Sequence, residues 1–573
     1  MKKNIQKIIK SALTEAKKSN GWPDFELNEI IVDYPKSEQF GDYTSNIAMI
    51  LAKKIGKNPM ETANYLKEII CRPELVSGSR DVTNGAQSIE MLKQVQHDMT
   101  GIFEKIEVAQ PGYLNFYLSK KYLQDIVEKI NTEKEKFGNS EVGKNIKINN
   151  EFISANPTGP LHLGNGRGGF YGDSLSRVLR KAGFEVTNEY YVNDAGGQVE
   201  KLGHSVLKDE EASYTGEYID ELNKKYAKLK DVREIGKIAA REVLENIIKK
   251  TTKEKMQISF DEWTSEQKLS DEGYDKRAIS LLKEKGLTYE SEGALWLKTT
   301  DFGDDKDRVL IKKDGKNAYI AGDCGYMLNK IERGYSRLIM GLGADHHGYV
   351  SRLKAVALAL GFNEDFRIII SQLVRLIKDG KEARMSKRAG NVINLDDLID
   401  EIGHDVTIFF FLMYSPDTHM NFDLGLAKER SSKNPVFYVQ YAHARIASIL
   451  AKSQITNNLQ QTTEKTKNLN FDRSKSLVVS CGLLTHEKEL SLIKELNKFP
   501  QLVEEISESY EVHKLPQYAM KLADKFHSFY DACKVIDENN EELTIARLSL
   551  INAVRIVLAE VLELIGVGAP SKM

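Results

Sequence analysis

The sequence predicts a multidomain α/β protein, with a central parallel β-sheet region, a separate N-terminal region and an all-α bundle after it. Three observations support this fold class. A length of 573 residues is enough for three or four domains of ~150 residues, each with its own core. Between about 140 and 405, apolar strand-like runs alternate with amphipathic helical stretches, which is typical of parallel strands joined by helical crossovers. Beyond about 406, helical spacing alone remains.

The composition excludes a wholly disordered chain and gives no general argument for a nucleic-acid partner. Hydrophobic residues make up 41% of the chain, and 81 Lys and Arg against 83 Asp and Glu leave a net charge of −2. Any site for RNA or phosphate must therefore be a local patch. No apolar run reaches the ~18 residues of a membrane span, and residues 1–18 have amphipathic spacing instead of an apolar leader. We expect a cytoplasmic protein without a membrane partner.

The N-terminal region, about 1–140, opens with a basic helix. Residues 1–18 carry six lysines against one glutamate, a local charge of +5. The excess fits either a solvated helix face or a surface that contacts a nucleic acid. Residues 71–100 contain Pro, Ser-Gly-Ser and Asn-Gly turn signals and are predicted to be an inserted surface segment.

The central region carries the strand signal, followed by a helical tail. The runs predicted as strands are Ile146–Ser154, Phe184–Val192, Arg337–Ala344 and Phe366–Ile377. Residues 200–300 are charged and largely helical, and we expect them to connect two halves of one sheet. The four cysteines are far apart and form no C-x-x-C pair, so neither a sequence-local zinc ribbon nor a disulfide framework is expected.

The most informative stretch runs from Glu151 to Gly169 and joins an expected strand to an expected helix. The strand ends near Ser154, a Pro- and Gly-rich turn follows, and a helix starts near Asn165. The carboxyl edge of a sheet is where open α/β folds bind ligands, and free N–H groups at a helix start suit a phosphate. His162 can donate to a phosphate oxygen that gains charge as a bond breaks. The alternative is an ordinary βα turn, which the spacing of Ser, Asn, Pro and His here disfavours.

A second stretch, residues 371–390, holds six Lys or Arg and two acids, a local charge of +4. It includes the string Arg-Met-Ser-Lys-Arg at 384–388. We predict a basic loop after a strand, able to close over a triphosphate and stabilise the charge of leaving pyrophosphate. Taken alone, such a stretch is more often a solvated surface.

Together the two stretches resemble the signatures of class I aminoacyl-tRNA synthetases. His162-Leu-Gly-Asn165 resembles H-I-G-H, and Arg384-Met-Ser-Lys-Arg388 resembles K-M-S-K-S. The wider sequence resembles the arginyl-tRNA synthetases in particular, in strings spread over nearly the whole chain apart from 71–100. The main strings are Ser-Ala-Asn-Pro-Thr-Gly-Pro-Leu-His (154–162), Tyr-Tyr-Val-Asn-Asp-Ala-Gly-Gly-Gln (190–198), Gly-Ala-Asp-His-His-Gly-Tyr (343–349) and Asn-Pro-Val-Phe-Tyr-Val-Gln-Tyr-Ala-His-Ala-Arg (434–445).

The resemblance implies a Rossmann-like catalytic domain at 141–405, with a helical connective insertion at about 200–300. It also implies an N-terminal α+β domain at 1–140 that contacts tRNA, and a helical anticodon-binding domain at 406–573. The implied reaction activates arginine with ATP as arginyl-adenylate and transfers it to the 3′ end of tRNA(Arg), with tRNA generally needed for the first step. Mg²⁺ is expected to arrive with ATP, without zinc or another protein-bound metal, and we expect a monomer.

The resemblance also implies roles for individual residues. The expected catalytic residues are His162, Asn165, Arg384 and Lys387. The expected ATP-binding residues are Gly159, Pro160, His162, Gly164, Asn165, Gly343, Asp345, His346, Met385, Ser386 and Lys387. The expected arginine-binding residues are Glu151, Ser154, Asn156, Tyr319, Asp323 and Tyr326. The expected tRNA-binding residues are Arg388, Tyr438 and Tyr441, although the two tyrosines fit a helical core equally well.

Two positions depart from the class signatures. Asn165 stands where the second histidine is usual, and Arg384 replaces the first lysine of the loop signature. An amide still donates one hydrogen bond and an arginine keeps the charge, so we expect activity to be retained with Lys387 in the main loop role.

Specificity for arginine is a question of charge, because a guanidinium needs a carboxylate fork and a polar wall. Tyr319 and Asp323 are four residues apart and would share one face of a helical turn. Without the resemblance, an exposed acid and a core tyrosine would be the simpler interpretation. With it, we expect Asp323 and Glu151 to engage the guanidinium and Asn156 to hold the α-amino or carboxylate end.

Residues 341–347 place small residues at a strand end, where a ribose or adenine can lie close. The adjacent His346 and His347 could suggest a metal, but neighbouring side chains point apart and no third ligand is evident, so adenosine contact is preferred. Three alternatives remain for the whole chain: a class I synthetase of other specificity, a small-molecule nucleotidyltransferase, and a catalytically silent RNA-binding paralogue.

Overall fold

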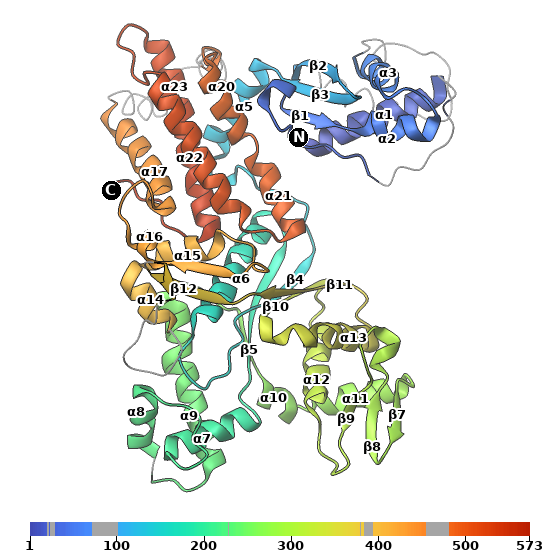
Figure 1. Cartoon of the computed structure of the whole chain (residues 1–573), viewed down its shortest axis with the longest axis vertical. Helices are drawn as coiled ribbons and strands as arrows, with labels where there is room; N and C mark the ends of the chain where they lie inside the picture. The colour runs from blue at the N-terminus through green and yellow to red at the C-terminus, as the bar shows by residue number, and fades with distance from the viewer. Residues whose placement is uncertain are drawn as a thin grey trace, which may run out of the picture. The chain divides into compact units, whose positions relative to one another are not determined.

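A computed structural model describes residues 1–19, 22, 29–71, 101–226, 228–378, 380–382, 394–453 and 481–573 (Figure 1). These residues form two compact units, each made of segments that are distant in sequence. Unit 1 comprises 1–137, 445–501 and 522–557, and unit 2 comprises 138–444, 502–521 and 558–573. Across the described ranges, no helix has both the length and the apolar character needed to cross a bilayer.

Unit 1 contains the predicted basic helix, α1 (Lys2–Ser19), which buries an apolar face formed by Ile5, Ile9 and Ala16. Three antiparallel strands form a sheet in the order β1-β3-β2, which confirms an α+β N-terminal domain. Its further elements are β1 (Tyr43–Ser45), α2 (Ile47–Ile55), α3 (Pro59–Cys71), β2 (Phe103–Ala109), β3 (Tyr113–Leu118) and α5 (Lys120–Glu133). The expected insertion at 71–100 lies, beyond Cys71, outside the described residues.

Unit 2 is built on a five-stranded parallel sheet in the order β11-β10-β4-β5-β6. Its strands are β4 (Lys147–Glu151), β5 (Glu185–Val192), β6 (Glu262–Ser265), β10 (Arg337–Gly343) and β11 (Asp365–Ser371). The parallel sheet and three of its strands are therefore confirmed as predicted. The run 366–377 is two strands instead of one, because the chain turns at Gln372 and Leu373 before β12 (Val374–Lys378), which pairs with other strands.

Helices cover the sheet and carry its crossovers. The long helix α6 (Leu163–Lys181) joins β4 to β5 and buries Phe170, Leu175 and Val178. In Figure 1, α11 (Tyr274–Glu284), α12 (Tyr319–Glu332) and α13 (Val350–Leu360) lie beside the small antiparallel sheet of β7 (Thr288–Ser291), β8 (Ala294–Leu297) and β9 (Arg308–Ile311). One apolar cluster fills the space among these elements and reaches Leu338 of β10, so α12 is held against the main sheet.

The expected connective insertion contains helices that pack very closely. Its first part is α7 (Gly197–Leu207), α8 (Glu217–Tyr226), α9 (Val232–Val243) and two π-helical turns, η4 (Leu244–Ile248) and η5 (Thr251–Lys255). Glycine is needed where α7 and α9 cross. A Cβ on Gly203 would lie 2.0 Å from the Val232 carbonyl oxygen, and one on Gly236 would lie 2.1 Å from that of Val199.

Gly203→Ala is therefore expected to lower the free energy of unfolding by about 1–3 kcal/mol, because the added methyl meets backbone that cannot rotate away. Urea unfolding followed by circular dichroism measures the change. Gly197→Ala on the same helix is the matched control, since a Cβ there meets no atom within 4 Å, and it should leave the midpoint unchanged. Equal midpoints for the two variants would contradict the close crossing.

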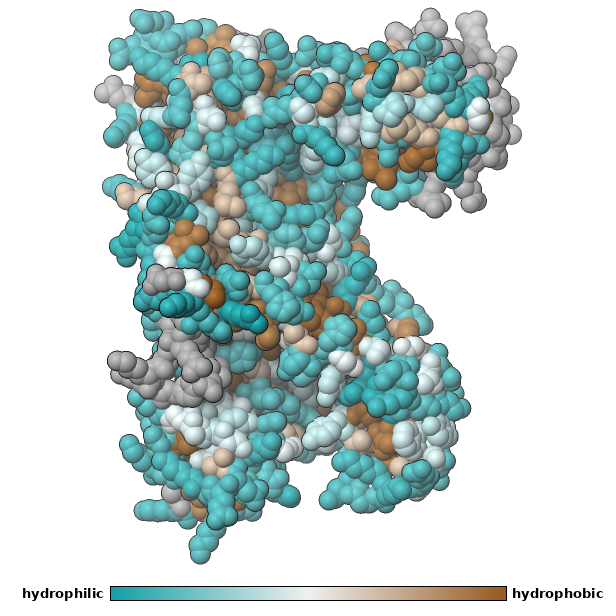
Figure 2. Space-filling view, viewed as in Figure 1, coloured by the Kyte–Doolittle hydropathy of each residue, from teal (hydrophilic) through white to brown (hydrophobic). Residues whose placement is uncertain are grey.

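The C-terminal part of the chain is predominantly helical, as predicted. Its described helices are α14 (Leu395–Ile402), α15 (His404–Leu412), α16 (Leu424–Lys428), α17 (Pro435–Lys452), α20 (Glu487–Leu496), α21 (Phe499–Ser509), α22 (Lys514–Ala532) and α23 (Glu541–Ile565). Within 406–453 and 481–573 the structure has one strand, where none was expected: β14 (Met420–Asp423) pairs with β12 and buries alternate residues. On the face shown in Figure 2, hydrophilic residues dominate and hydrophobic ones lie in small groups.

Candidate functional site

A cavity of about 1320 Å³ in unit 2 is lined from the carboxyl ends of β4, β5, β10 and β11. This is the edge at which open α/β sheets bind ligands. Every described residue expected at the arginine or ATP site lines it: Glu151, Ser154, Asn156, Gly159, Pro160, His162, Gly164, Asn165, Tyr319, Asp323, Tyr326, Gly343, Asp345 and His346. The structure thus brings together side chains that lie almost two hundred residues apart in sequence.

The chain leaves β4 through a strained backbone. Ile153 and Ser154 have φ values of +67° and +39°, which non-glycine residues rarely adopt and which cost about 1–3 kcal/mol each. The strained pair brings the Ser154 hydroxyl between two partners. It donates to Glu151 Oε1 at 3.1 Å and accepts from the Tyr191 amide at 3.1 Å, so the end of β4 is fixed to β5.

The turn before α6 is closed by a reciprocal cap. His162 is the N-cap, and its Nδ1 accepts from the Gly164 amide at 3.1 Å, while Asn165 Oδ1 accepts from the His162 amide at 3.1 Å. Asn165 therefore holds this turn by hydrogen bonding its backbone. Because Nδ1 is an acceptor, the neutral ring carries its proton on Nε2. Burial lowers the pKa of His162, with Asp345 opposing the shift, so the ring is neutral near pH 7.

The end of β10 forms another wall of the cavity. Gly341, Leu342 and Gly343 line it and are followed by a 3₁₀ turn, η7 (Ala344–Tyr349). A Cβ on Gly343 would lie 2.6 Å from Asp345 Oδ1, the end of an exposed side chain that can move aside.

Helix α12 supplies the aromatic and acidic groups predicted from their spacing. Tyr319 and Asp323 both line the cavity, and Tyr319 is 81% exposed at the start of the helix. Tyr326 is buried, and its hydroxyl donates to Glu151 Oε2 at 2.8 Å. Its ring lies 4.4 Å from the ring of Tyr191. The face of α12 that carries these residues is therefore turned toward the end of β4.

One acid of this wall was missed by the sequence analysis. Glu266 begins α10 (Glu266–Asp271), directly after β6, and lines the cavity near Asp323. Burial, together with the charges of Asp323 and Asp194, raises the pKa of Glu266 to about 7. Burial also raises the pKa of Asp323 to about 6; Arg352 opposes this shift and Glu151 adds to it. The sequence did hold a signal for a helix start here, because Ser265 precedes Glu266 and is the N-cap of α10.

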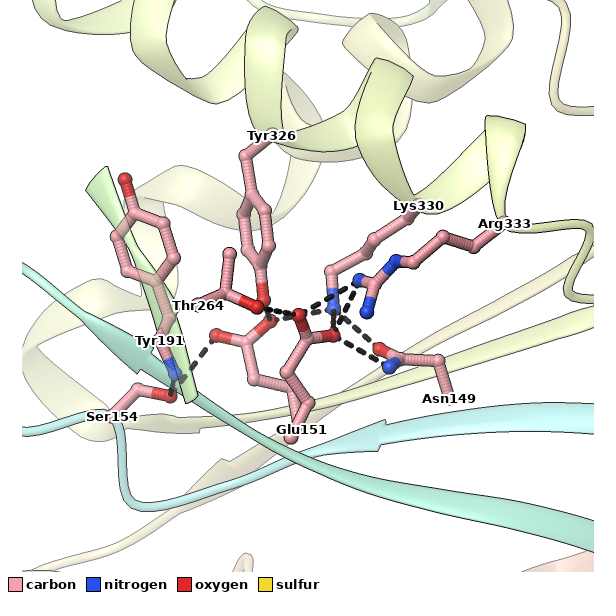
Figure 3. Close-up of polar contacts among 9 residues, drawn as sticks. Asn149, Glu151, Ser154, Tyr191, Thr264, Tyr326, Lys330 and Arg333 are labelled. Carbon is pink, nitrogen blue, oxygen red and sulfur yellow. Dashed lines mark hydrogen bonds and ion pairs between the residues drawn. The ribbon is translucent and has the colours of Figure 1, made fainter. Parts of the chain in front are cut away.

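Beneath these acids, buried charges join β4, β5 and α12 (Figure 3). Lys330 Nζ lies 3.0 Å from Glu151 Oε2 and 2.8 Å from Glu189 Oε2, with all three side chains at most 5% exposed. Glu189 also accepts from Arg333 at 2.8 and 2.9 Å and from the Asn149 amide at 2.5 Å. Burial acts to raise the pKa of Glu189, but the charges of Lys330 and Arg333 prevail and lower it to about 2.

The described lining is strongly acidic. Its charged side chains are Glu151, Glu217, Glu221, Glu266, Asp323, Asp345, Asp397 and Lys201. Such a cavity attracts a cationic ligand and repels a polyphosphate. The residues expected in the basic loop, Arg384, Met385, Ser386, Lys387 and Arg388, lie outside the described residues. After that segment the chain resumes beside the α6 cap, because the Leu395 amide donates to the Leu161 carbonyl at 2.9 Å.

Of the three expected tRNA contacts, the two that the structure describes lie apart from this cavity, on α17. Tyr441 is 48% exposed and Tyr438 is half-buried. Among the residues that the structure describes, no three His, Cys, Asp or Glu side chains are grouped to hold a metal ion, and His346 pairs instead with Asp345 at 3.5 Å.

Comparisons with known proteins identify the family of this chain. Three family models match: "Arginyl tRNA synthetase N terminal domain" at 3–84, "tRNA synthetases class I (R), catalytic domain" at 126–259 and 239–406, and "DALR anticodon binding domain" at 439–573. The first of these ends inside the stretch 71–100.

Curated relatives match over their whole length. The chain is 41% identical to an arginine–tRNA ligase of Listeria welshimeri, covering 100% of both chains, and 39% identical to one of Bacillus licheniformis, covering 99% of both. The solved arginyl-tRNA synthetase of Thermus thermophilus has the same fold, with a TM-score of 0.74 over 100% of both chains and 20% identity. The chain therefore belongs to the arginyl-tRNA synthetase family.

Proposed function

We propose that the cavity at the carboxyl edge of the sheet is where this chain activates arginine with ATP and charges tRNA(Arg). Family membership supplies the reaction. The observation that carries the assignment of the site is that Glu151, Asp323 and Glu266 line the same cavity as the α6 cap. An acidic wall suits a guanidinium, and a helix start suits a phosphate.

The arginine side chain is bound by the acidic wall. Asp323 and Glu266 face the cavity from α12 and α10, and they offer carboxylate oxygens to the planar guanidinium. Glu151 adds charge from the end of β4, and the exposed Tyr319 covers the ligand. Asn156 and Ser154, at the strained turn, hold the α-amino and carboxylate end and present the carboxylate to ATP.

ATP lies toward the α6 cap, with its adenosine along Gly343, Asp345 and His346 at the end of β10. The arginine carboxylate attacks the α-phosphorus, the bond to the bridging oxygen breaks, and pyrophosphate leaves. His162 donates from Nε2 to the oxygens that gain charge, which requires a neutral ring. Gly159, Pro160, Gly164 and Asn165 shape the turn that receives the phosphates.

Because the lining is acidic, ATP needs cations beside it in the proposed reaction. Because the described wall repels a polyphosphate, ATP enters as its magnesium complex, and Lys387 with Arg384 supplies positive charge to the leaving pyrophosphate. Met385 and Ser386 belong to the same loop. The proposed reaction uses no zinc.

The terminal ribose hydroxyl of tRNA then attacks the arginyl carbonyl, and AMP leaves. We propose that tRNA is also needed for the first step and that residues 1–140 and 406–573 bind it, with Arg388, Tyr438 and Tyr441 among the contacts. The domain limits at 140 and 405, the cytoplasmic location and the monomeric state belong to the same proposal.

Pyrophosphate exchange into ATP tests the activity directly. It is run with each of the twenty amino acids, with and without tRNA. Exchange with arginine alone, and only with tRNA present, is the expected result. Exchange with lysine or glutamine would contradict the specificity, and RNA binding without any exchange would favour a silent paralogue.

The paired acids give a testable pH dependence. Below their raised pKa values, of about 6 for Asp323 and about 7 for Glu266, these carboxyls are protonated and lose the charge that holds the guanidinium. The arginine KM is therefore expected to fall as pH rises from about 6 to about 8, with proton release on arginine binding.

Steady-state exchange kinetics across this range measures the effect, and titration calorimetry in buffers of different ionisation enthalpy counts the released protons. Glu266→Gln is the comparison variant, because it removes the group with the higher pKa and should move the inflection to lower pH. An arginine KM that is constant across this range would exclude the paired acids from the guanidinium site.

A further inference from the structure

The two buried glutamates of the charge network share their partners unequally. Glu151 lines the cavity and accepts from Ser154, Tyr326 and Lys330, at 3.1, 2.8 and 3.0 Å. A carboxylate has about four acceptor positions, so one remains for a ligand. Glu189 does not line the cavity, yet it collects more donors: Lys330, Arg333 through two contacts, Asn149 and Thr264.

Geometry places Glu189 where it competes with Glu151 for cations. The two residues are register partners on adjacent strands, and Lys330 Nζ lies between their Oε2 atoms. Arg333 contacts Glu189 from the end of α12. The four charges sum to zero only because Glu189 is ionised. Charges in such a dry site act on one another strongly.

Loss of the Glu189 charge would leave Glu151 as the one carboxylate among these four groups. Lys330 would keep its contact with Glu151 and its hydrogen bond to Asn149, and Arg333 would lose the carboxylate that it contacts. An arriving guanidinium would meet a neutralised carboxylate and a net positive floor. Glu189 thus protects the negative charge that Glu151 presents to the cavity, although it touches no ligand itself.

We propose that Glu189 is a positioning residue that sets arginine affinity, by sharing Lys330 with Glu151 and by balancing the charge of Arg333. The inference rests on the proposed binding of arginine at Glu151. The summed charge of Glu151, Glu189, Lys330 and Arg333, here called the cluster charge, then controls the arginine KM. Glu189 takes no part in binding ATP.

The test compares the wild type, whose cluster charge is zero, with three variants whose cluster charges are +1, −1 and zero. Glu189→Gln makes the cluster +1 and is expected to raise the arginine KM by about 10- to 30-fold. Arg333→Gln makes it −1 and is expected to lower the KM by about two- to fivefold. The double variant Glu189→Gln/Lys330→Met returns the charge to zero with little change in volume, and its KM should return to within about threefold of the wild type.

A merely structural role gives a different pattern, because each substitution would loosen the same core and the double variant would be the worst. The ATP KM, the kcat at saturating arginine and the thermal midpoint are measured for all four forms. Glu185→Gln is the matched control, since it removes an exposed acid from the same strand and should leave every constant unchanged.

A KM that is unchanged or rises in Arg333→Gln, or a double variant weaker than Glu189→Gln, would overturn the proposal. An ATP KM that rises in step with the arginine KM would do the same. Failure of the proposed function is distinguishable, because the wild type itself would then show no exchange with arginine. If Glu189→Gln does not fold, the opposite sign expected for Arg333→Gln, whose side chain is 24% exposed, still decides the question.

Discussion

Asp323→Asn is expected to raise the arginine KM by about 100- to 1000-fold while changing the ATP KM by less than about threefold. The Asp323 side chain lines the cavity on α12 and faces the acidic wall. Asparagine keeps the shape of the side chain but loses the charge that pairs with a guanidinium. Steady-state pyrophosphate exchange, with each substrate varied in turn, measures both constants.

Glu332→Gln is the control for this change, because it removes an acid from the other end of the same helix, where Glu332 pairs with Arg277 on the surface. It should leave both constants unchanged. Equal increases in the arginine and ATP constants of Asp323→Asn would remove Asp323 from the arginine site. Tighter binding of citrulline, the uncharged analogue of arginine, by the variant would strengthen the assignment.

His162→Asn is expected to lower the kcat of pyrophosphate exchange by about 100- to 1000-fold, the loss typical of removing one donor to a developing negative charge. His162 caps α6 as well as facing the cavity, so an alanine would disturb both roles. Asparagine is a strong N-cap residue and preserves the helix start, but its shorter amide leaves no donor at the position of the imidazole Nε2. The variant therefore separates catalysis from folding.

The two roles are read by two measurements. The thermal midpoint of His162→Asn should equal that of the wild type. His162→Ala should show the same fall in kcat as His162→Asn and should also lose about 0.5–2 kcal/mol of stability. If His162→Asn retained its kcat to within about threefold, His162 would be a helix cap without a catalytic role.

Residues whose position depends on local spacing could be predicted from the sequence. The turn from Ser154 to Asn165 reads as strand, glycine-rich turn and helix within one short stretch, and the structure has that order. The pair Tyr319 and Asp323 shares a face because four residues make about one helical turn. In both cases, neighbouring backbone alone determines where the side chains point.

Glu266 could not be found in the same way. It follows β6, a strand of only four residues inside the charged stretch 200–300, which was predicted to connect two halves of the sheet. Short strands carry too few positions to show alternation. Its value as a site residue comes from Asp323, which is 57 positions away in the sequence and reaches it only because α12 packs beside α10.

The burial of Glu189 and Lys330 could not be predicted from the sequence either. A glutamate in a strand and a lysine near a helix end both read as solvent-facing, yet the structure buries them together. Burial of a charge is tolerable only with a partner, and the partner is 141 residues away. Which two residues pair across so many positions depends on the order of the strands in the sheet. The spacing of residues within one strand or helix does not show that order.

The far side of α6 adds a consequence for the order of events during synthesis. Ser174 donates to the Leu564 carbonyl at 2.8 Å, and Lys181 lies 2.8 Å from Glu560. The helix that starts at His162 is therefore completed by residues made some four hundred positions later. Because chains emerge from the N-terminus, unit 2 stays unfinished on the ribosome until 558–573 arrive, and a nascent enzyme acquires its proposed phosphate site among the last steps of its folding.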